Sequence, residues 1–154
     1  MMIDPVSVSA IVPLPVPRAF DRFVRELHAW WPREYTWSQD VLHDIGVEPH
    51  VGGLCFEIGP HAFRCDWGRV LAWVPPEHIQ LAWHVGPRRE PVPDPAKTSI
   101  VTVSFAPDGR ERTVIALVHD AFERHGPGGA DYRTAMASAQ GWPLILQRFV
   151  EAAI

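Results

Sequence analysis

Lysine is almost absent from this chain of 154 residues, which contains only Lys97. The formal net charge is −4, and no basic run is longer than Arg88–Arg89. Proteins that bind nucleic acids need clustered lysine and arginine to neutralise phosphates. The composition therefore argues against a nucleic-acid partner.

Long apolar runs are also missing, since none approaches the roughly 18 residues that a membrane span requires. The N-terminal residues include an early acid, Asp4, and a proline, Pro5, without the charged segment of a signal peptide. We therefore expect a cytoplasmic protein with no membrane partner.

Cysteine is scarce, with Cys55 and Cys65 ten positions apart. If residues 59–61 form a hairpin tip, the two lie roughly opposite each other on neighbouring strands, within disulfide reach. A reducing cytosol favours two free thiols instead. The spacings C-x-x-C and H-E-x-x-H, glycine-rich phosphate loops and dinucleotide fingerprints are all missing. We expect no metal and no cofactor.

Tryptophan, in contrast, is abundant, with seven residues in the chain: Trp30, Trp31, Trp37, Trp67, Trp73, Trp83 and Trp142. Each side chain is large, flat and mostly apolar, with one hydrogen-bond donor. The set suits a well-packed core, and it equally suits a cavity with aromatic walls. The count alone does not decide between them.

Length and apolar periodicity predict one domain over residues 1–154. We expect a strand at 6–10, a helix at 17–27 and a second short helical segment at 28–37. Period-two alternation then predicts six strands, at 41–48, 54–58, 63–74, 79–84, 99–105 and 113–120. Consecutive hairpins require a meandering antiparallel sheet, so the fold class is α+β.

The proline pair Pro75–Pro76 sets the expected register of one hairpin. A two-residue link there predicts three cross-strand pairs on one face: Ala72 with Ile79, Val70 with Leu81, and Gly68 with Trp83. By the same parity, Trp67 and Trp73 belong on the outer face of the sheet. An exposed pair there would form an interaction surface.

Apolar residues recur at steps of three and four from Tyr132 to Ala153, which predicts one long amphipathic helix over residues 130–154. Pro143 inside this stripe removes a hydrogen bond to Ala139 and costs roughly 3 kcal/mol. Gly141 adds about 1 kcal/mol. We therefore expect a kink near residues 141–143.

Four ordered segments carry a family resemblance: His50-Val51-Gly52-Gly53, Trp67-Gly68-Arg69-Val70 running on to Val74-Pro75-Pro76, the strand Thr113–His119 with its terminal histidine, and Gly141-Trp142. Their order resembles the helix-grip fold of the START, pollen-allergen and polyketide-cyclase superfamily (SRPBCC). Within it, the chain is most similar to homologues of the heat-shock ATPase activator. Ala121 departs from the glycine that this family often has there, and the proline-rich loop at 86–96 is longer than usual.

This resemblance implies a curved sheet of about seven strands wrapped round the C-terminal helix, with two short helices after the first strand. It also implies a cavity between sheet and helix. It does not imply one activity, because relatives include lipid carriers, cyclases, co-chaperone domains and self-protection proteins, some with roles in stress response.

His119 is the first candidate for catalysis. Its strand parity places it on the inner face with Ile115 and Leu117, and the family histidine falls there. A neutral imidazole can exchange a hydrogen bond with a ligand. The alternative is a structural histidine bonded to the backbone.

Asp66 is the second candidate, because its parity matches that of Gly68 and Val70 and predicts an inward carboxylate. A buried carboxylate is paired or has a perturbed pKa, which would suit an acid or base. Arg64 is the expected partner. The alternative is a structural ion pair or an exposed strand end.

The candidate ligand-binding residues are those expected to line the interior: Trp31, Trp37, Phe56, Val70, Leu81, Trp83, Val103, Leu117, His119, Trp142 and Leu146. Three functions stay open. The first is a non-catalytic module that binds a small apolar or aromatic molecule. The second is a cyclase- or aromatase-type enzyme with His119 and Asp66 as acid–base groups. The third is a co-chaperone-like domain that binds a protein partner, or a second copy, through its outer sheet face.

Overall fold

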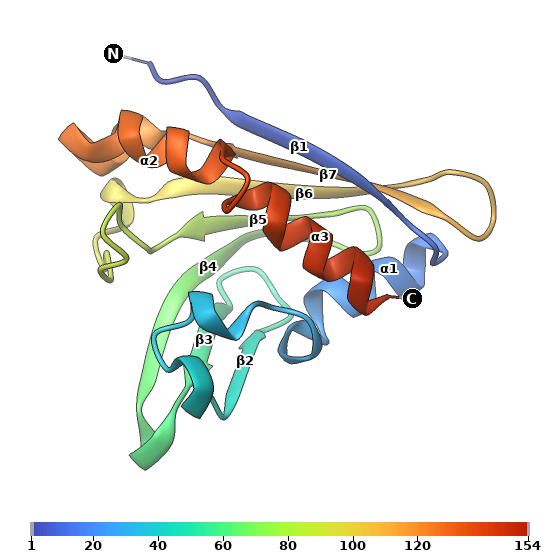
Figure 1. Ribbon diagram of the computed structural model, residues 1–154, viewed down its shortest axis with the longest axis horizontal. Helices are drawn as coiled ribbons and strands as arrows, with labels where there is room; N and C mark the ends of the chain where they lie inside the picture. Colours follow the sequence, from blue (N-terminus) through green and yellow to red (C-terminus); the bar gives the residue numbers. More distant parts are fainter. Residues whose placement is uncertain (1, 154) are drawn as a thin grey trace.

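The computed structural model describes residues 2–153, and in that range seven strands form one antiparallel sheet accompanied by three α-helices (Figure 1). The strands are β1 (Val6–Val12), β2 (Asp44–Val47), β3 (Leu54–Ile58), β4 (Arg64–Val74), β5 (His78–Trp83), β6 (Ser99–Pro107) and β7 (Thr113–Asp120). The helices are α1 (Val16–Val24), α2 (Gly129–Ala137) and α3 (Trp142–Ala152). This is the predicted α+β helix-grip arrangement.

The sheet has the order β1-β7-β6-β5-β4-β3-β2, so successive hairpins from β2 to β7 form a meander and β1 pairs with the last strand. Figure 1 shows β4 leaving the layer of β5, β6 and β7 and bending towards β3 and β2. The sheet therefore curls, and α3 lies across its concave side.

Most element boundaries differ from the sequence prediction by a few residues. The helix expected at 17–27 ends at Val24 and is followed by short 3₁₀ turns at Leu27–Ala29 and Arg33–Tyr35. The strand expected at 41–48 begins only at Asp44, because Gln39–Val41 forms a further 3₁₀ turn. Gln39 has a positive φ of 48°, which interrupts extended backbone.

Two β-bulges in β4 change which of its side chains face inward. Against β3, Cys55 pairs with Gly68 and Phe56 pairs with Asp66, so Trp67 is an extra residue in β4. Against β5, Val70 pairs with Leu81 and Ala72 pairs with Gln80, so Leu71 is extra. A bulge leaves one residue unpaired and re-aims the side chains beside it.

The bulges decide the outcome of the predicted register. The pairs Gly68–Trp83 and Val70–Leu81 are confirmed, whereas the Ala72–Ile79 pair is wrong because the bulge at Leu71 shifts Ile79 to Trp73. The predicted outer-face pair is also wrong. Trp67 is only 6% exposed, and the ring of Trp73 packs 5.4 Å from the ring of Phe20.

The hairpin between β3 and β4 turns at residues 59–61 as expected, with a 3₁₀ turn at Pro60–Ala62. The two cysteines do not oppose each other, because Cys55 pairs with Gly68 and Cys65 pairs with Glu57. Both are free, which confirms the prediction of two thiols. Burial raises the pKa of the Cys55 thiol, so this side chain is a small core residue.

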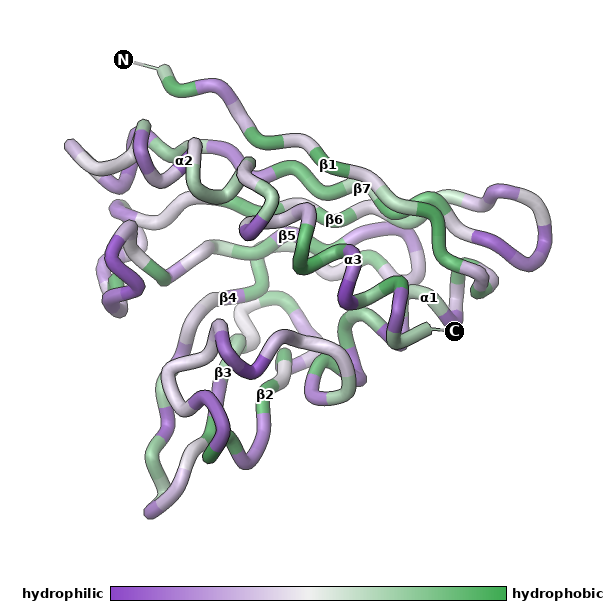
Figure 2. Tube along the Cα trace, viewed as in Figure 1, coloured by the Kyte–Doolittle hydropathy of each residue, from purple (hydrophilic) through white to green (hydrophobic). Residues whose placement is uncertain are grey.

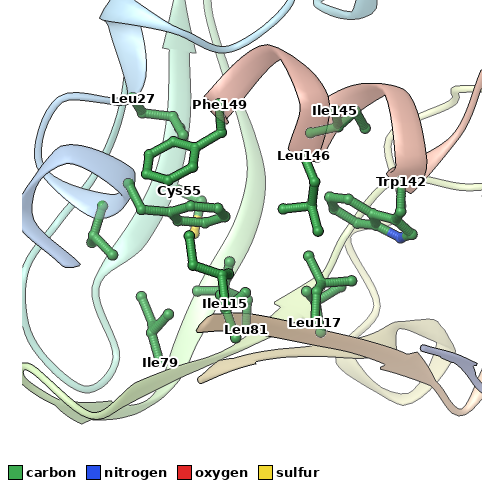
Figure 3. Packing of buried hydrophobic residues seen from close by; sticks show 14 of the residues in the cluster. Leu27, Cys55, Ile79, Leu81, Ile115, Leu117, Trp142, Ile145, Leu146 and Phe149 are labelled. Carbon is green, nitrogen blue, oxygen red and sulfur yellow. The ribbon is translucent and has the colours of Figure 1, made fainter. Parts of the chain in front are cut away.

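Helix α3 supplies the centre of the core. Four of its side chains are buried, namely Trp142, Ile145, Leu146 and Phe149. Figure 3 shows them facing Ile79, Leu81, Ile115 and Leu117 of the sheet. Each contributes roughly 1.5–3 kcal/mol by leaving water. Hydrophilic residues gather away from this core, for example at the tip of the β6–β7 hairpin (Figure 2).

The long C-terminal helix is not only kinked but interrupted. Helix α2 ends at Ala137, Ser138 adopts extended backbone angles, and Gly141 precedes α3. Pro143 lies in the first turn of α3, where a proline needs no backbone N–H partner. The break therefore removes the cost expected for a proline in a helix interior.

Gly141 lies so close to the end of α2 that a side chain there has no room. A Cβ at this position would overlap the carbonyl oxygen of Met136 and would lie 2.6 Å from that of Ala135. Because backbone atoms cannot move aside as a flexible side chain can, the turn between α2 and α3 requires glycine.

We predict that Gly141→Ala lowers the free energy of unfolding by about 3 kcal/mol, because the backbone must shift to admit the methyl group. The control is Gly109→Ala, where φ is +80° but nothing lies within 4 Å of the added Cβ. Its cost is limited to backbone strain, about 1–2 kcal/mol. Equal losses in urea unfolding would contradict the proposed close approach.

Candidate functional site

A cavity of about 330 Å³ opens between the sheet, α2 and the break before α3. It lies between the sheet and the C-terminal helices, as the resemblance implied. Its walls come from the 31–37 segment, from β2 to β5, from the loop after β5 and from residues 132–145. Six aromatic side chains line it: Trp31, Tyr35, Trp37, Trp67, Trp83 and Tyr132.

Three tryptophans form the inner end of this cavity. Trp31 and Trp67 stack with ring centroids 5.9 Å apart and planes 18° apart, and Trp83 meets Trp67 edge-on at 5.7 Å. All three also line a second, deeper void of about 30 Å³, so they separate the cavity from the core. They present flat apolar surfaces, which suit a flat apolar ligand.

Glu57 is a buried carboxylate in the cavity wall, and sequence reasoning missed it. It is 2% exposed and accepts three hydrogen bonds, from the backbone N–H of Trp37 at 3.0 Å and from the N–H and hydroxyl of Ser38 at 2.9 and 2.8 Å. These bonds compensate its burial and fix the 37–38 segment over β3. Because Glu57 alternates with the apolar Phe56, the pattern predicts that Glu57 faces solvent. Cysteine side chains are often buried, and Cys55 shares the face of Glu57, so Cys55 was the residue that could have indicated a buried Glu57.

Tyr132 of α2 is a second missed residue. Its hydroxyl accepts a hydrogen bond from Trp83 Nε1 at 2.7 Å and donates one to the carbonyl of Val85 at 2.9 Å. Burial raises the pKa of this phenol, so it stays protonated at neutral pH. It ties α2 to the end of β5 and holds the Trp83 ring in the wall.

Hydrogen bonds between three separate segments frame the cavity mouth. Trp37 Nε1 donates to the carbonyl of Arg89 at 2.7 Å, and the Tyr35 hydroxyl donates to the carbonyl of Gln140 at 2.6 Å. The Arg89 guanidinium lies over the Tyr35 ring, 5.3 Å from its centroid. The proline-rich loop and the helix break are thus joined through the 35–37 segment.

The predicted ligand-binding residues divide into three groups. Trp31, Trp37 and Trp83 line the cavity. Leu81, Val103, Leu117 and Trp142 line the deeper void together with Trp31 and Trp83. The last group, Val70, Leu146, His119 and Phe56, lines neither space.

His119 belongs to a buried polar chain rather than to the cavity. Trp142 Nε1 donates to His119 Nδ1 at 2.9 Å, and His119 Nε2 lies 2.7 Å from Ser99 Oγ. Ser99 Oγ is also 2.7 Å from His125 Nε2. An indole N–H can only donate, so Nδ1 is the acceptor and Nε2–H donates to the serine, whose proton is left for His125.

This chain makes His119 a structural residue that holds the first turn of α3 against β6 and β7. It is fully buried, and burial lowers the pKa of His119 to about 3, with the neighbouring His125 as a lesser cause. The partners are side chains, not the backbone group that the structural alternative predicted.

Two predicted inward residues face outward instead. Asp66 pairs with Arg64 at 3.1 Å, with about two-fifths of each side chain exposed. The ion pair with Arg64 is as predicted, but the inward position of Asp66 is wrong. The extra residue at Trp67 reverses the alternation between Gly68 and Asp66, so the two no longer share a face. Phe56 lies under the Arg64 guanidinium, 4.9 Å from the ring centroid, on the face opposite to Cys55 and Glu57.

Within residues 2–153, no three side chains of histidine, cysteine, aspartate or glutamate come together as a metal site would require. None of the helices in that range has the length and apolar character needed to span a membrane.

We predict that Glu57→Gln lowers the free energy of unfolding by about 2 kcal/mol, because an amide NH₂ would face the N–H donors of residues 37–38. The control is Glu77→Gln, an exposed carboxylate, for which a change within about 0.5 kcal/mol is expected. Chemical unfolding of both variants checks this, and similar small changes would show that the three bonds contribute little.

Stability is also expected to depend on His119 below pH 6.5. Between pH 6.5 and about 3 the unfolded chain binds a proton at this residue and the folded chain does not. The free energy of unfolding therefore decreases as the pH falls through that window, by up to about 1.4 kcal/mol per unit. His119→Gln should be less stable at pH 7 and should lose this slope. His43→Gln, at an exposed position, should keep it. Parallel profiles for wild type and His119→Gln would contradict the assignment.

Comparison with solved structures places the fold among known proteins. The anthrahydroquino-gamma-pyrone synthase Txn09 is 28% identical, with a TM-score of 0.69, and the match covers 98% of this chain and 97% of the synthase. The self-sacrificing resistance protein CalC from Micromonospora echinospora is 26% identical, with a TM-score of 0.63, over 96% of this chain and 92% of CalC. The protein MLL2253 from Mesorhizobium loti, 21% identical with a TM-score of 0.64 over 97% and 96% of the two chains, shares the fold.

A search of curated proteins finds no significant match to this sequence. The family model of Activator of Hsp90 ATPase homolog 1-like proteins, in contrast, matches residues 17–153, which is most of this chain. The match confirms the resemblance inferred from the four ordered segments, and the chain belongs to the family of Activator of Hsp90 ATPase homolog 1-like proteins.

Proposed function

We propose that this protein binds a small, flat, largely apolar molecule in the cavity between the sheet, α2 and the helix break. The observation that carries the proposal is the stack of Trp31 on Trp67 at the inner end of a space of about 330 Å³. This volume is at the lower end of the range typical of small-molecule sites. A space of this size with flat aromatic walls suits two or three fused rings better than a long acyl chain.

The relatives support a small-molecule role without deciding its kind. One relative with 28% identity is a synthase, and one with 26% identity is a resistance protein. Both align with this chain over nearly their whole length, so the comparison concerns almost all of each chain.

Catalysis of the cyclase type is the second candidate, and the likeness to the synthase favours it. The cavity geometry favours binding, because the two residues first considered as acid and base, His119 and Asp66, lie outside it. Glu57 does line the cavity, but both of its oxygens already accept hydrogen bonds from residues 37–38. The protein-partner alternative loses its expected tryptophan surface, since Trp67 and Trp73 do not form an exposed pair.

A ligand screen tests the proposal directly. Tricyclic aromatic compounds and fatty acids are compared by quenching of tryptophan fluorescence and by shift of the melting temperature. Binding at a ligand concentration 100-fold above Kd stabilises the fold by about 2.7 kcal/mol. Aromatic compounds should produce both signals, and a screen in which no apolar class produces either would refute the proposal.

Two matched variants place the binding in this cavity. Ala135→Trp adds a large ring to α2 at the cavity wall and should weaken binding at least tenfold. Ala130→Trp adds the same ring to an exposed position on the same helix that does not line the cavity, and should leave Kd unchanged. Equal effects of the two substitutions would locate the ligand elsewhere.

A further inference from the structure

We propose that Trp67 is the hydrogen-bond donor that recognises the ligand, and that the ligand is a planar aromatic ketone whose carbonyl oxygen accepts from the indole N–H. This inference rests on the proposed function and specifies its ligand class. It starts from one atom. Among residues 2–153, Trp67 Nε1 alone is a buried side-chain nitrogen or oxygen with no hydrogen-bond partner.

The other buried indole N–H groups all have an acceptor, unlike that of Trp67. Trp30 Nε1 donates to the carbonyl of Phe23, Trp83 Nε1 to the Tyr132 hydroxyl, and Trp142 Nε1 to His119. Trp37, which is only partly buried, donates to the Arg89 carbonyl. Buried polar groups in folded proteins almost always have a partner, and an unpaired one at a functional site calls for an explanation.

The protein groups around the cavity do not supply the missing acceptor. The Glu57 carboxylate receives its three bonds from the 37–38 segment, and the Tyr132 oxygen is bonded to Trp83 and Val85. The deeper void that Trp67 also lines is surrounded by apolar and tryptophan side chains. A water molecule needs two to four polar partners, and this void does not offer them. Trp67 lines the cavity as well as this void, so we infer that its acceptor belongs to a molecule bound in the cavity.

The charge of Glu57 narrows the chemistry of that acceptor. A ligand carboxylate at the inner end would be buried with the Glu57 carboxyl group and without a cation, because Arg89, the single lysine or arginine in the cavity lining, lies at the mouth over the Tyr35 ring. A neutral carbonyl oxygen has no such penalty and accepts a hydrogen bond in the plane of its ring, where a stacked ligand can present it. The aromatic walls require the rest of the molecule to be flat, which points to a ketone conjugated with fused rings.

The bulge in β4 supports a specific role for this side chain. Without an extra residue at position 67, the parity of β4 would turn the indole to the outer face, as the sequence predicted. Bulges next to functional sites commonly re-aim a side chain. Here the bulge brings the Trp67 ring into the cavity wall and stacks it on Trp31.

The test uses xanthone and xanthene, which have the same three rings and differ in the carbonyl group. Their dissociation constants are measured for the wild type and for Trp67→Phe, which keeps an aromatic ring and removes the donor. Loss of ring area affects both ligands alike, whereas loss of the donor affects xanthone alone. We expect the affinity ratio of xanthone to xanthene to fall about fivefold in the variant, the size of one hydrogen bond.

A second measurement does not depend on the variant folding. In ¹⁵N–¹H spectra of the wild type, the indole signal of Trp67 should move downfield on addition of xanthone and not on addition of xanthene. An unchanged affinity ratio, or the same indole shift with both ligands, overturns the ketone inference and leaves the proposed function standing. Failure of xanthone and xanthene to bind the wild type, while other apolar compounds of the screen bind, overturns the ketone inference alone, and failure of every apolar class overturns both proposals.

Discussion

The close approach of Gly141 to the carbonyls of Ala135 and Met136 is the constraint on which the rest of the structure depends. It allows the chain to turn between α2 and α3 within four residues, so the two helices serve different surfaces. Helix α3 enters the concave side of the sheet with four buried side chains. Helix α2 stays at the side and provides Tyr132 and Met136 as cavity wall. The cavity lies at the break between these two helices, and residues of α2, of the break and of α3 all line it.

Much of the fold could be predicted from local patterns. Hairpin signals such as Pro75–Pro76 fix which strands are neighbours, and helical periodicity identifies the C-terminal segment, because these depend on residues close in sequence. The position of Trp67 could not be predicted in the same way. Parity counting assumes an uninterrupted strand, and the bulges at Trp67 and Leu71 arise where one strand must satisfy two partners in a strongly curled sheet.

The location of the candidate site was predicted from the sequence, but several of its residues and their contacts were not. The tryptophans at positions 31, 37 and 83 were identified by size and location, and they do line the cavity. Glu57 was missed because a charged residue between apolar neighbours is ordinarily on the wet face, and only the donors of residues 37–38, brought from a different segment, make its burial favourable. His119 was located on the correct face, but its partners Ser99 and Trp142 come from distant positions that no spacing reveals.

The frame of the cavity mouth has a consequence for sequence divergence. Both acceptors in it are main-chain carbonyls, those of Arg89 and Gln140, while the donors are the side chains of Trp37 and Tyr35. A main-chain acceptor is present whatever residue occupies the position, so substitutions in the proline-rich loop and in the helix joint leave these bonds available. The two aromatic donors have no such substitute. Substitutions of Arg89 and Gln140 can thus change the charge and size of the entrance while the two bonds that frame it are kept.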